Sequence, residues 1–403
     1  MENKNLKPVV RFPEFIDDWK SNILGKQENI NFLKGKGISK ADIVDEGKTQ
    51  CIRYGELYTI YDEVIDKVYS KTNLPTSELV LSKANDVIIP ASGETQIDIA
   101  TASCVLRDDI ALSGDLNIIR SEINGVFLSY YLNNKKKKAI ARLSQGSSVI
   151  HLYNPHLKTL KLNLPIPDEQ KKIANFLTSI DARINVLKEK KDTLLDFKKG
   201  VLQKIFNQDI RFKDDNGNDF PDWKEDDFKK LTKINQGLQI AISERYSSPI
   251  ENGYFYITNE FLKGNSLSYY ILNPPESVKC DEDDVLMTRT GNTGQVVTGV
   301  KGAFHNNFFK INFDRSQINK DFLVYFLKFY TTQCSILRLA GTSTIPDLNH
   351  SDFYRLKLNY PKLEEQNKIV NYLTALDNKI EAIQQKIDAS IDYKKGLLQK
   401  MFV

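Results

Sequence analysis

Two stretches of the sequence decide the fold, because they are nearly the same stretch. Residues 162–206 read LNLPIPDEQKKIANFLTSIDARINVLKEKKDTLLDFKKGVLQKIF, and residues 358–402 read LNYPKLEEQNKIVNYLTALDNKIEAIQQKIDASIDYKKGLLQKMF. They align without a gap at a constant offset of 196 residues, and about half of the positions are identical. A repeat of this length indicates an internal duplication, so we expect the chain to contain two equivalent halves.

Each repeated stretch is expected to form one long helix. Proline precedes an acidic first turn in both copies, where carboxylates suit the positive end of the helix dipole. Apolar residues then recur in alternating steps of four and three, which is the heptad pattern of a coiled coil. This seam includes Ile173, Leu177 and Ile184 in the first copy, Ile369, Leu373 and Ile380 in the second, and the polar interruptions Lys191, Lys198 and Lys394. Polar seam residues lower stability but help to fix partner and register.

The segments before the two helices also correspond. RFPEFIDDWK (11–20) matches DFPDWKE (219–225), which pairs Trp19 with Trp223 as an anchor that packs the entering chain onto its domain. Further matches are NDVIIPASGETQ with DDVLMTRTGNTGQ, a strand and a glycine-containing loop, and INGVFLSYYLNN (123–134) with INKDFLVYFLKF (318–329), which have helical spacing. Other short runs rich in β-branched and aromatic residues, such as CIRYGELYTIYDEV (51–64), are expected to be strands.

The expected fold is of the α+β class. Two mixed α/β domains, at residues 1–161 and 209–357, are each followed by a long helical region, at 162–208 and 358–403. Two similar amphipathic helices can pack antiparallel as a coiled coil, which would give the chain an approximate two-fold repeat.

Composition sets only broad limits. The chain has 403 residues, which suits two globular units, and a formal net charge of +4, which permits nucleic-acid binding but argues for it weakly. No apolar run reaches the 18 residues of a membrane span, and the N-terminus lacks the apolar core of a secretory signal. Four cysteines lie far apart without a CxxC pair, so we expect reduced thiols, no zinc site and a cytoplasmic protein.

Two equivalent heads on a pair of long helices suit a split DNA target. Half-sites about one helical turn, or roughly 10 base pairs, apart can meet matching heads on one face of the duplex. The alternative is a coiled-coil adaptor that joins two protein-binding domains without reading DNA. The helices alone do not decide between these two interpretations.

The sequence resembles a known family, the DNA sequence-specificity subunits of type I restriction-modification systems. The resemblance covers essentially the whole chain and rests on three motifs that occur twice. These are Pro-x-x-x-Glu-Gln-x-x-Ile-x-x-x-Leu at the helix start, Lys-Gly-Leu/Val-Leu-Gln-Lys at the helix end, and Gly-Ser/Thr-Ser-x-Ile before the helix.

The resemblance implies that two target-recognition domains each read one half of a bipartite sequence, while the helices set the non-specific spacer and dock partners. On this basis Glu169, Gln170, Glu365 and Gln366 join the seam residues as partner-docking or spacer positions. The implied partners are double-stranded DNA, two modification (methyltransferase) subunits and two restriction (translocase and endonuclease) subunits. S-adenosylmethionine, ATP and Mg would act in those partners, with no cofactor in this chain.

Catalysis by this chain itself is not expected. Asn273-Pro-Pro-Glu276 resembles the Asp/Asn-Pro-Pro-Tyr/Phe loop of adenine methyltransferases, but Glu276 cannot stack on a flipped base, and a plain Pro-Pro turn explains it better. The four histidines show no metal-binding spacing. The chain is therefore expected to be a non-catalytic subunit with no metal site.

Candidate DNA contacts occur in loops. Gly-hinged basic loops let backbone amides and lysines approach phosphates, and Gln, Asn or Arg can read bases through paired hydrogen bonds. In the first half the candidates are Lys34, Lys36, Ser39, Lys40, Ser92, Thr95, Gln96, Lys135, Lys136, Ser147 and Ser148. In the second half they are Gln239, Ser243, Arg245, Arg289, Asn292, Thr293, Gln295, Thr342 and Ser343. The alternative for each is a solvated loop, a structural turn or, for the lysine run, a solvated helix face.

Overall fold

The chain forms two compact units, and each unit combines one domain with parts of both long helices. The computed structural model describes residues 6–146, 148–264, 268–341 and 346–403. Unit 1 comprises Met1–Glu189 and Gln384–Val403, and unit 2 comprises Lys190–Ile383. The domain boundaries expected from the sequence follow the ends of the helical regions, whereas compactness divides the chain within the helices themselves.

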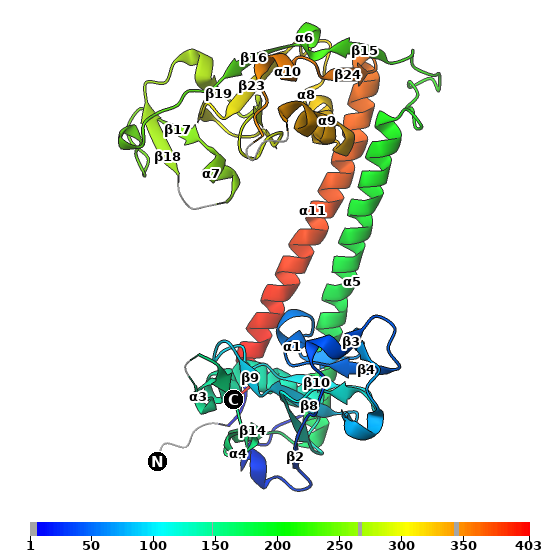
Figure 1. Ribbon diagram of the computed structural model, residues 1–403, viewed down its shortest axis with the longest axis vertical. Coiled ribbons are helices and arrows are strands. Elements are labelled where there is room, and N and C mark those ends of the chain that lie inside the picture. The colour runs from blue at the N-terminus through cyan, green and yellow to red at the C-terminus, as the bar shows by residue number, and fades with distance from the viewer. Residues whose placement is uncertain (1–5, 147, 265–267, 342–345) are drawn as a thin grey trace. The chain divides into compact units, whose positions relative to one another are not determined.

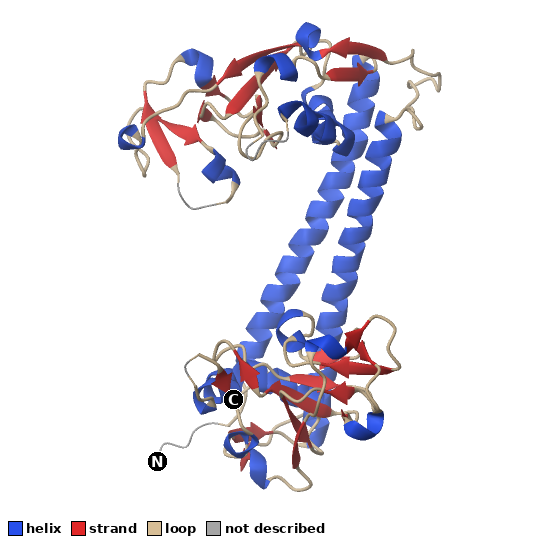
Figure 2. Ribbon diagram, in the orientation of Figure 1, coloured by secondary structure: helices blue, strands red, loops and turns tan. Residues whose placement is uncertain are grey.

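The two long helices are α5 (Pro167–Phe206) and α11 (Leu363–Lys400), and they stand out in Figures 1 and 2. Within unit 1, Leu177 near the start of α5 shares a buried cluster with Leu398 near the end of α11. Within unit 2, Ile205 near the end of α5 shares a buried cluster with Val370 near the start of α11. The start of each helix thus meets the end of the other, which confirms the expected antiparallel pairing.

Unit 1 contains two mixed five-stranded sheets. One has the order β2-β12-β8-β10-β5 and the other the order β3-β6-β4-β11-β7. Their strands are β2 (Asn31–Lys34), β12 (Leu116–Arg120), β8 (Asp86–Pro90), β10 (Ser103–Val105), β5 (Val64–Ile65), β3 (Ile43–Val44), β6 (Lys71–Thr72), β4 (Thr49–Ile52), β11 (Ala111–Leu112) and β7 (Val80–Leu81). β5 runs parallel to β10, and β4 runs parallel to β11, so both sheets mix directions.

Unit 2 repeats this topology with four-stranded sheets. The orders β16-β23-β20-β21 and β18-β17-β22-β19 match β2-β12-β8-β10 and β6-β4-β11-β7 of unit 1, so that among the described residues one edge strand of each sheet, β5 or β3, has no counterpart. Their strands are β16 (Thr232–Gln236), β23 (Phe308–Phe313), β20 (Val285–Thr288), β21 (Val296–Val297), β18 (Tyr269–Leu272), β17 (Gly253–Ile257), β22 (Gly302–Phe304) and β19 (Lys279–Cys280). The parallel pair recurs as β17 and β22. The duplication inferred from the helices therefore extends through both domains.

In the described part of the chain, three two-stranded ribbons complete the sheets. β1 (Lys20–Ile23) pairs with β14 (Lys161–Leu164), and its counterpart β15 (Lys224–Asp227) pairs with β24 (Lys357–Tyr360), so the chain enters each domain beside the strand that leads to the long helix. β9 (Ser92–Gly93) pairs with β13 (Ile150–His151).

Short helices cover the domains. In unit 1 they are α1 (Glu56–Thr59), α2 (Gly125–Tyr131), the π-helical turn η4 (Leu132–Lys136), α3 (Lys137–Leu143) and α4 (Asn154–Leu157), with single 3-10 turns at Leu24–Lys26, Lys40–Asp42 and Thr76–Glu78. In unit 2 they are α6 (Phe228–Leu231), α7 (Asn259–Leu262), α8 (Lys320–Lys328), α9 (Tyr330–Ala340) and α10 (His350–Phe353), with 3-10 turns at Ile242–Glu244 and Glu276–Val278. Among the described residues, no helix combines the length and apolar character that a membrane span requires.

The core of each unit joins the domain to the helices. Trp19 is 1% exposed and packs edge-on against Phe127, Tyr131 and Phe402, the last of which follows α11. In unit 2, Trp223 packs against Phe206 at the end of α5. Both tryptophans therefore act as the expected anchors.

One sequence expectation was only partly right. Residues 51–64 were expected to form a strand, but the described structure places β4, α1 and the start of β5 there. The buried carboxylate of Glu56 accepts hydrogen bonds from the backbone N–H of Arg53 and from the hydroxyl of Ser70. These bonds stabilise a helical turn inside a run of strand-favouring residues.

Candidate nucleic-acid interface

The Glu-Gln pair that begins each long helix is buried inside its own unit. Glu169 is 1% exposed, and its two carboxylate oxygens accept hydrogen bonds from Nε and Nη2 of Arg11, both at 2.7 Å. Glu365 is fully buried and accepts the same two bonds from Arg211, both at 2.8 Å. In each case the hydrogen bond to glutamate raises the pKa of the arginine. Such bidentate, charge-assisted pairs fix geometry as well as energy.

The glutamine of each pair bonds the residue that precedes one helix of its domain. Gln170 Oε1 accepts from the backbone N–H of Asn124, the residue before α2, and its Nε2 donates to the carbonyl of Pro165. Gln366 makes the equivalent bonds to Asn319, before α8, and to Pro361. Since a buried amide needs partners for both ends, these bonds specify where the domain helix begins relative to the long helix.

These contacts change the interpretation of the predicted docking residues. Glu169, Gln170, Ile173, Leu177, Ile184, Glu365, Gln366, Ile369 and Leu373 are buried, and Ile380 is half-buried. The nine buried side chains pack within the chain, and Ile380 keeps part of its surface accessible. Eight of the ten, all except Ile184 and Ile380, take part in these hydrogen bonds or in the buried clusters of the two units, which is compatible with a spacer role, while docking at these positions stays a prediction.

In unit 1 the structure brings three candidate loops to one edge. A Cβ added to Gly35 would lie 1.9 Å from the carbonyl oxygen of Ser113, so only glycine permits this close approach. The N–H of Gly114 donates to Gly37, and the N–H of Ala91 donates to Asp115. The Ser92 loop in turn pairs with His151. The loops at 34–40, 92–96 and 148–151 are therefore linked through backbone hydrogen bonds.

Unit 2 assembles the corresponding loops in the same way. A Cβ on Gly237 would lie 2.2 Å from the carbonyl oxygen of His305, so Gly237 is the structural counterpart of Gly35. The N–H of Arg289 donates to the carbonyl of Asn307, and the N–H of Leu348 donates to the carbonyl of Arg289. The loops at 237–245, 305–307, 289–295 and 346–348 thus meet at one edge of the domain.

Some predicted contacts are already engaged within the chain. Arg289 is a candidate for reading a base, with a structural turn as the alternative. Its Nη2 donates to Asp347 at 2.7 Å, and its guanidinium lies 5.5 Å from the centre of the Phe309 ring. Arg245 donates to the carbonyl of Ile240 and stacks on tyrosine rings. Both arginines brace loops in this structure, because a carboxylate or carbonyl of the chain already accepts their hydrogen bonds.

Several hydroxyl groups are also engaged. Ser39 bonds the carboxylate of Asp42 at 2.7 Å, Thr95 bonds that of Asp98 at 2.6 Å, and Thr293 bonds the carbonyl of Pro346 at 2.7 Å. Ser92 is 9% exposed and sits within β9. These side chains shape the turns from which others project.

Other candidates remain on the surface. Exposed side chains are those of Lys34, Lys36, Lys40, Gln96 and Ser148 in unit 1 and Gln239, Ser243, Asn292 and Gln295 in unit 2. Gln239 accepts a hydrogen bond from Asn306, which holds it beside the 305–307 loop. Ser147, Thr342 and Ser343 lie outside the described residues. The two units therefore present different polar side chains from equivalent loops.

The lysine run has a more complex setting than the sequence suggested. Lys135 is exposed on the π-helical turn, and Lys136 lies 5.3 Å from the centre of the Tyr131 ring. Lys137 lines a hollow that also contains Asp62, Glu63 and Asp98. Carboxylates beside part of the run reduce its positive potential, so a simple phosphate-binding helix face does not describe it.

The structure adds two residues that sequence reasoning missed. Lys328 of α8 and Gln333 of α9 line a shallow hollow of about 610 Å³ together with Asn292 and Gln295. Gln333 Nε2 donates to the carbonyl of Gly294 at 2.9 Å and so supports the loop. No motif marks either residue, because both come from helices more than 30 residues away in the sequence.

His305 occupies the same edge of unit 2. Burial, with a smaller contribution from Arg245, lowers the pKa of His305 to about 4. Its Nδ1 accepts a hydrogen bond from the backbone N–H of Asn307 at 3.2 Å. The ring is therefore neutral near pH 7 and serves as an acceptor that shapes the loop.

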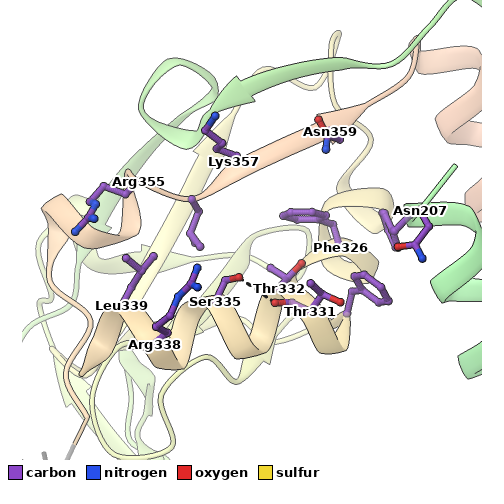
Figure 3. A pocket seen from close by; sticks show the side chains of 13 residues that line it. Asn207, Phe326, Thr331, Thr332, Ser335, Arg338, Leu339, Arg355, Lys357 and Asn359 are labelled. Carbon is purple, nitrogen blue, oxygen red and sulfur yellow. Dashed lines mark hydrogen bonds between the residues drawn. The ribbon is translucent and has the colours of Figure 1, made fainter. Parts of the chain in front are cut away.

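A second hollow in unit 2 contains none of the predicted contacts. It has a volume of about 390 Å³ and lies between α9 and the ribbon that includes β24 (Figure 3). Two of its three cationic side chains are paired, Arg355 with Asp352 at 3.3 Å and Lys357 with Glu225 at 2.7 Å. With its charges largely balanced, this hollow is a weaker candidate for nucleic acid than the loop edge.

Comparisons with known proteins agree with this architecture. The family described as "Type I restriction modification DNA specificity domain" matches residues 17–196 and 222–392. The type I restriction enzyme MjaVIII specificity subunit of Methanocaldococcus jannaschii is 25% identical over 432 aligned residues, covering 100% of this chain and 96% of the relative. The putative type I restriction enzyme MjaX specificity subunit of that organism is 26% identical over 297 residues, covering 70% of this chain and 68% of the relative.

Two solved structures share the fold. The S subunit of a type I restriction-modification system from M. genitalium superposes with a TM-score of 0.62 at 16% identity, covering 98% of this chain and 99% of the other. A chain from a structure of complex assembly and conformational transition in a type I R-M system gives a TM-score of 0.59 at 17% identity, covering 95% and 96%.

Proposed function

The chain belongs to the family of type I restriction-modification DNA specificity domains, and from this premise we propose that it is the non-catalytic subunit that recognises a bipartite DNA target. Each domain reads one half of the target, and the paired helices set the non-specific spacer between the halves. The chain directs adenine methylation or ATP-dependent cleavage by its partner subunits.

One observation carries this proposal. Both domains bring equivalent loops to one edge of the same sheet framework, yet the exposed side chains on those loops differ. The loop at 34–40 presents Lys36 where its counterpart in unit 2 presents Gln239, and Gly93 is followed by Glu94 where Gly291 is followed by Asn292. Amide side chains can form paired hydrogen bonds with adenine, and lysines neutralise phosphates. Two half-sites of different sequence require domains that share a framework and differ in the polar side chains that their loops expose.

The partners follow from the same proposal. Two modification subunits and two restriction subunits would assemble on one chain, because a duplicated molecule offers equivalent surfaces twice. S-adenosylmethionine, ATP and Mg would bind those subunits. This chain would supply DNA recognition and spacing.

Salt-dependent DNA binding tests the proposal against the adaptor alternative. A specificity subunit bound to its methyltransferase should bind a duplex with both half-sites, and the logarithm of affinity should fall linearly with the logarithm of salt concentration, because phosphate contacts release counterions. A duplex with one half-site scrambled should compete at least tenfold less well. Equal binding of scrambled and intact duplexes would contradict bipartite recognition, and no binding would favour an adaptor.

A further inference from the structure

Two lysines interrupt the apolar seam of the helix pair at equivalent positions. Lys198 lies near the end of α5 and Lys394 near the end of α11, and their side chains are only 19% and 15% exposed. A buried lysine is costly unless carboxylates compensate its charge. The contacts of both side chains show how that cost is offset.

In unit 1, Lys394 joins three elements. Its Nζ lies 2.7 Å from Asp181 Oδ1 on α5 and 3.3 Å from Glu63 Oε2, just before β5. The hydroxyl of Tyr130, on α2 of the domain, donates to Asp181. Burial alone would lower the pKa of Lys394, but the carboxylates of Glu63 and Asp181 more than offset it, so the pKa is raised. Lys394 is therefore charged and is held by the two carboxylates.

Unit 2 has the same arrangement of a lysine, an aspartate and a tyrosine. Lys198 pairs with Asp377 on α11, and the hydroxyl of Tyr325, on α8 of the domain, donates to Asp377 at 2.6 Å. Each lysine also lies 5.1 Å from the centre of its tyrosine ring. Among the ion pairs of the described residues, Lys198 has one carboxylate partner where Lys394 has two.

The bonding pattern differs from that of an ordinary seam contact. An aspartate on the helix that leaves the domain is shared between a lysine on the returning helix and a tyrosine of the domain. An apolar residue at the lysine position would usually cost less, and buried polar groups are best attested as devices that fix one arrangement among several. The lysines therefore have a role in geometry.

We propose that Lys394 and Lys198 are positioning residues, which fix the angle at which each recognition domain is mounted on the helix pair by closing the clusters Tyr130–Asp181–Lys394 and Tyr325–Asp377–Lys198. The consequence for DNA rests on the proposed function, because a fixed mounting angle makes the spacer between half-sites strict. The extra carboxylate of Glu63 makes the mounting of the first domain the stiffer of the two.

The test uses the full chain and two small changes. Tyr130→Phe removes only the hydroxyl that bonds Asp181 and keeps the fully buried ring in place, so the domain should fold. Lys394→Met removes the charge and keeps the length of the side chain. Lys395→Met is the matched control, because Lys395 is the exposed neighbour on the same helix.

Mounting angle is measured without DNA. Spin labels on Val44 of β3 and Val186 of α5, which are 37% and 62% exposed and belong to the same unit, report the distance from domain to helix by pulsed electron resonance. Exposed Cys334 is first changed to serine. We expect one narrow distribution in the parent and the control, and a broadened or displaced one in Tyr130→Phe and Lys394→Met. An unchanged distribution in both variants overturns the proposal, whatever happens to stability.

Two further readouts connect the cluster to its energy and to DNA. A double-mutant cycle compares the unfolding equilibrium constant of unit 1 in Tyr130→Phe, in Lys394→Met and in the double variant. The two substitutions should be coupled by about tenfold or more in this constant, as expected for charge-assisted hydrogen bonds. Additive effects would contradict a shared cluster. On duplexes whose spacer is one base pair longer or shorter than the cognate one, the variants should discriminate at least fivefold less than the parent. If the parent itself shows no preference for a bipartite duplex, the proposed function fails, while the distance distributions still decide the mounting role.

Discussion

The glutamate that begins each long helix should be essential for the stability of one unit only. Glu169→Gln removes the negative charge that holds Arg11, while Glu169 is 1% and Arg11 12% exposed at the side chain. Breaking a buried ion pair by removing one partner typically costs about 3–5 kcal/mol. Because Arg11 retains some access to water, the lower end of that range applies, and we expect a loss of about 3 kcal/mol in the stability of unit 1.

Hydrogen exchange followed by mass spectrometry measures this effect for each unit. Peptides from the buried strands of unit 1 should lose protection by about 3 kcal/mol, and the melting temperature of unit 1 should fall by roughly 6–12 °C, whereas peptides of unit 2 should be unchanged. Glu365→Gln should destabilise unit 2 by a similar amount and leave the peptides of unit 1 unchanged. Asp168→Asn, in the same first turn but exposed, is the control and should cost less than about 1 kcal/mol. A loss below 1 kcal/mol for Glu169→Gln, or equal losses in both units, would refute the reasoning.

Three further predictions follow from individual side chains. Phe402→Ala should destabilise unit 1 by about 3–5 kcal/mol, because Phe402 is 2% exposed in an aromatic core. Phe206→Ala should destabilise unit 2 by less, because Phe206 is only half-buried. Chemical denaturation of each variant measures the two losses, and equal losses would contradict the packing. His305 should make unit 2 less stable as pH falls from about 6.5 to about 4, because the unfolded state takes up a proton in that window and the folded state does not. Thermal melts should show a loss of roughly 1–2 kcal/mol in the stability of unit 2, and this loss should be absent in His305→Gln. The same pH profile in parent and variant would show that His305 is not the group responsible. Gln295→Ala should weaken binding to one half-site by about tenfold or more without lowering the stability of the chain. Competition with duplexes altered in either half measures this effect. A uniform loss of affinity across both halves would show that Gln295 does not read bases.

Much of the framework could be predicted from the sequence because its causes are local. Heptad spacing and the proline-flanked acidic turn predicted both helices, and α5 and α11 each begin five residues inside the helical regions expected at 162–208 and 358–403. Matching segments predicted the repeated domain topology. Where local preference failed, at residues 51–64, a buried glutamate bonded to Ser70 had changed a strand-favouring run into a turn.

The contacts of the candidate residues were less predictable because they are long-range. The ion-pair partner of Arg289, Asp347, lies 58 residues later in the sequence. The Glu-Gln motif looked like a docking surface, although Arg11, which neutralises its glutamate, lies 158 residues earlier. Pairings of this kind depend on how sheets bring distant loops together, and no spacing rule encodes them.

The central claim is that each domain reads its own half of one split DNA sequence. The most direct measurement is to co-express the chain with its methyltransferase partner, replace residues 209–357 by the equivalent domain of another family member, and map methylated adenines across the host genome. The account predicts one bipartite motif for the parent, and for the chimera a motif in which one half changes while the other half and the spacer stay the same. A chimera that changes both halves, or a parent complex that leaves no split motif, would contradict it.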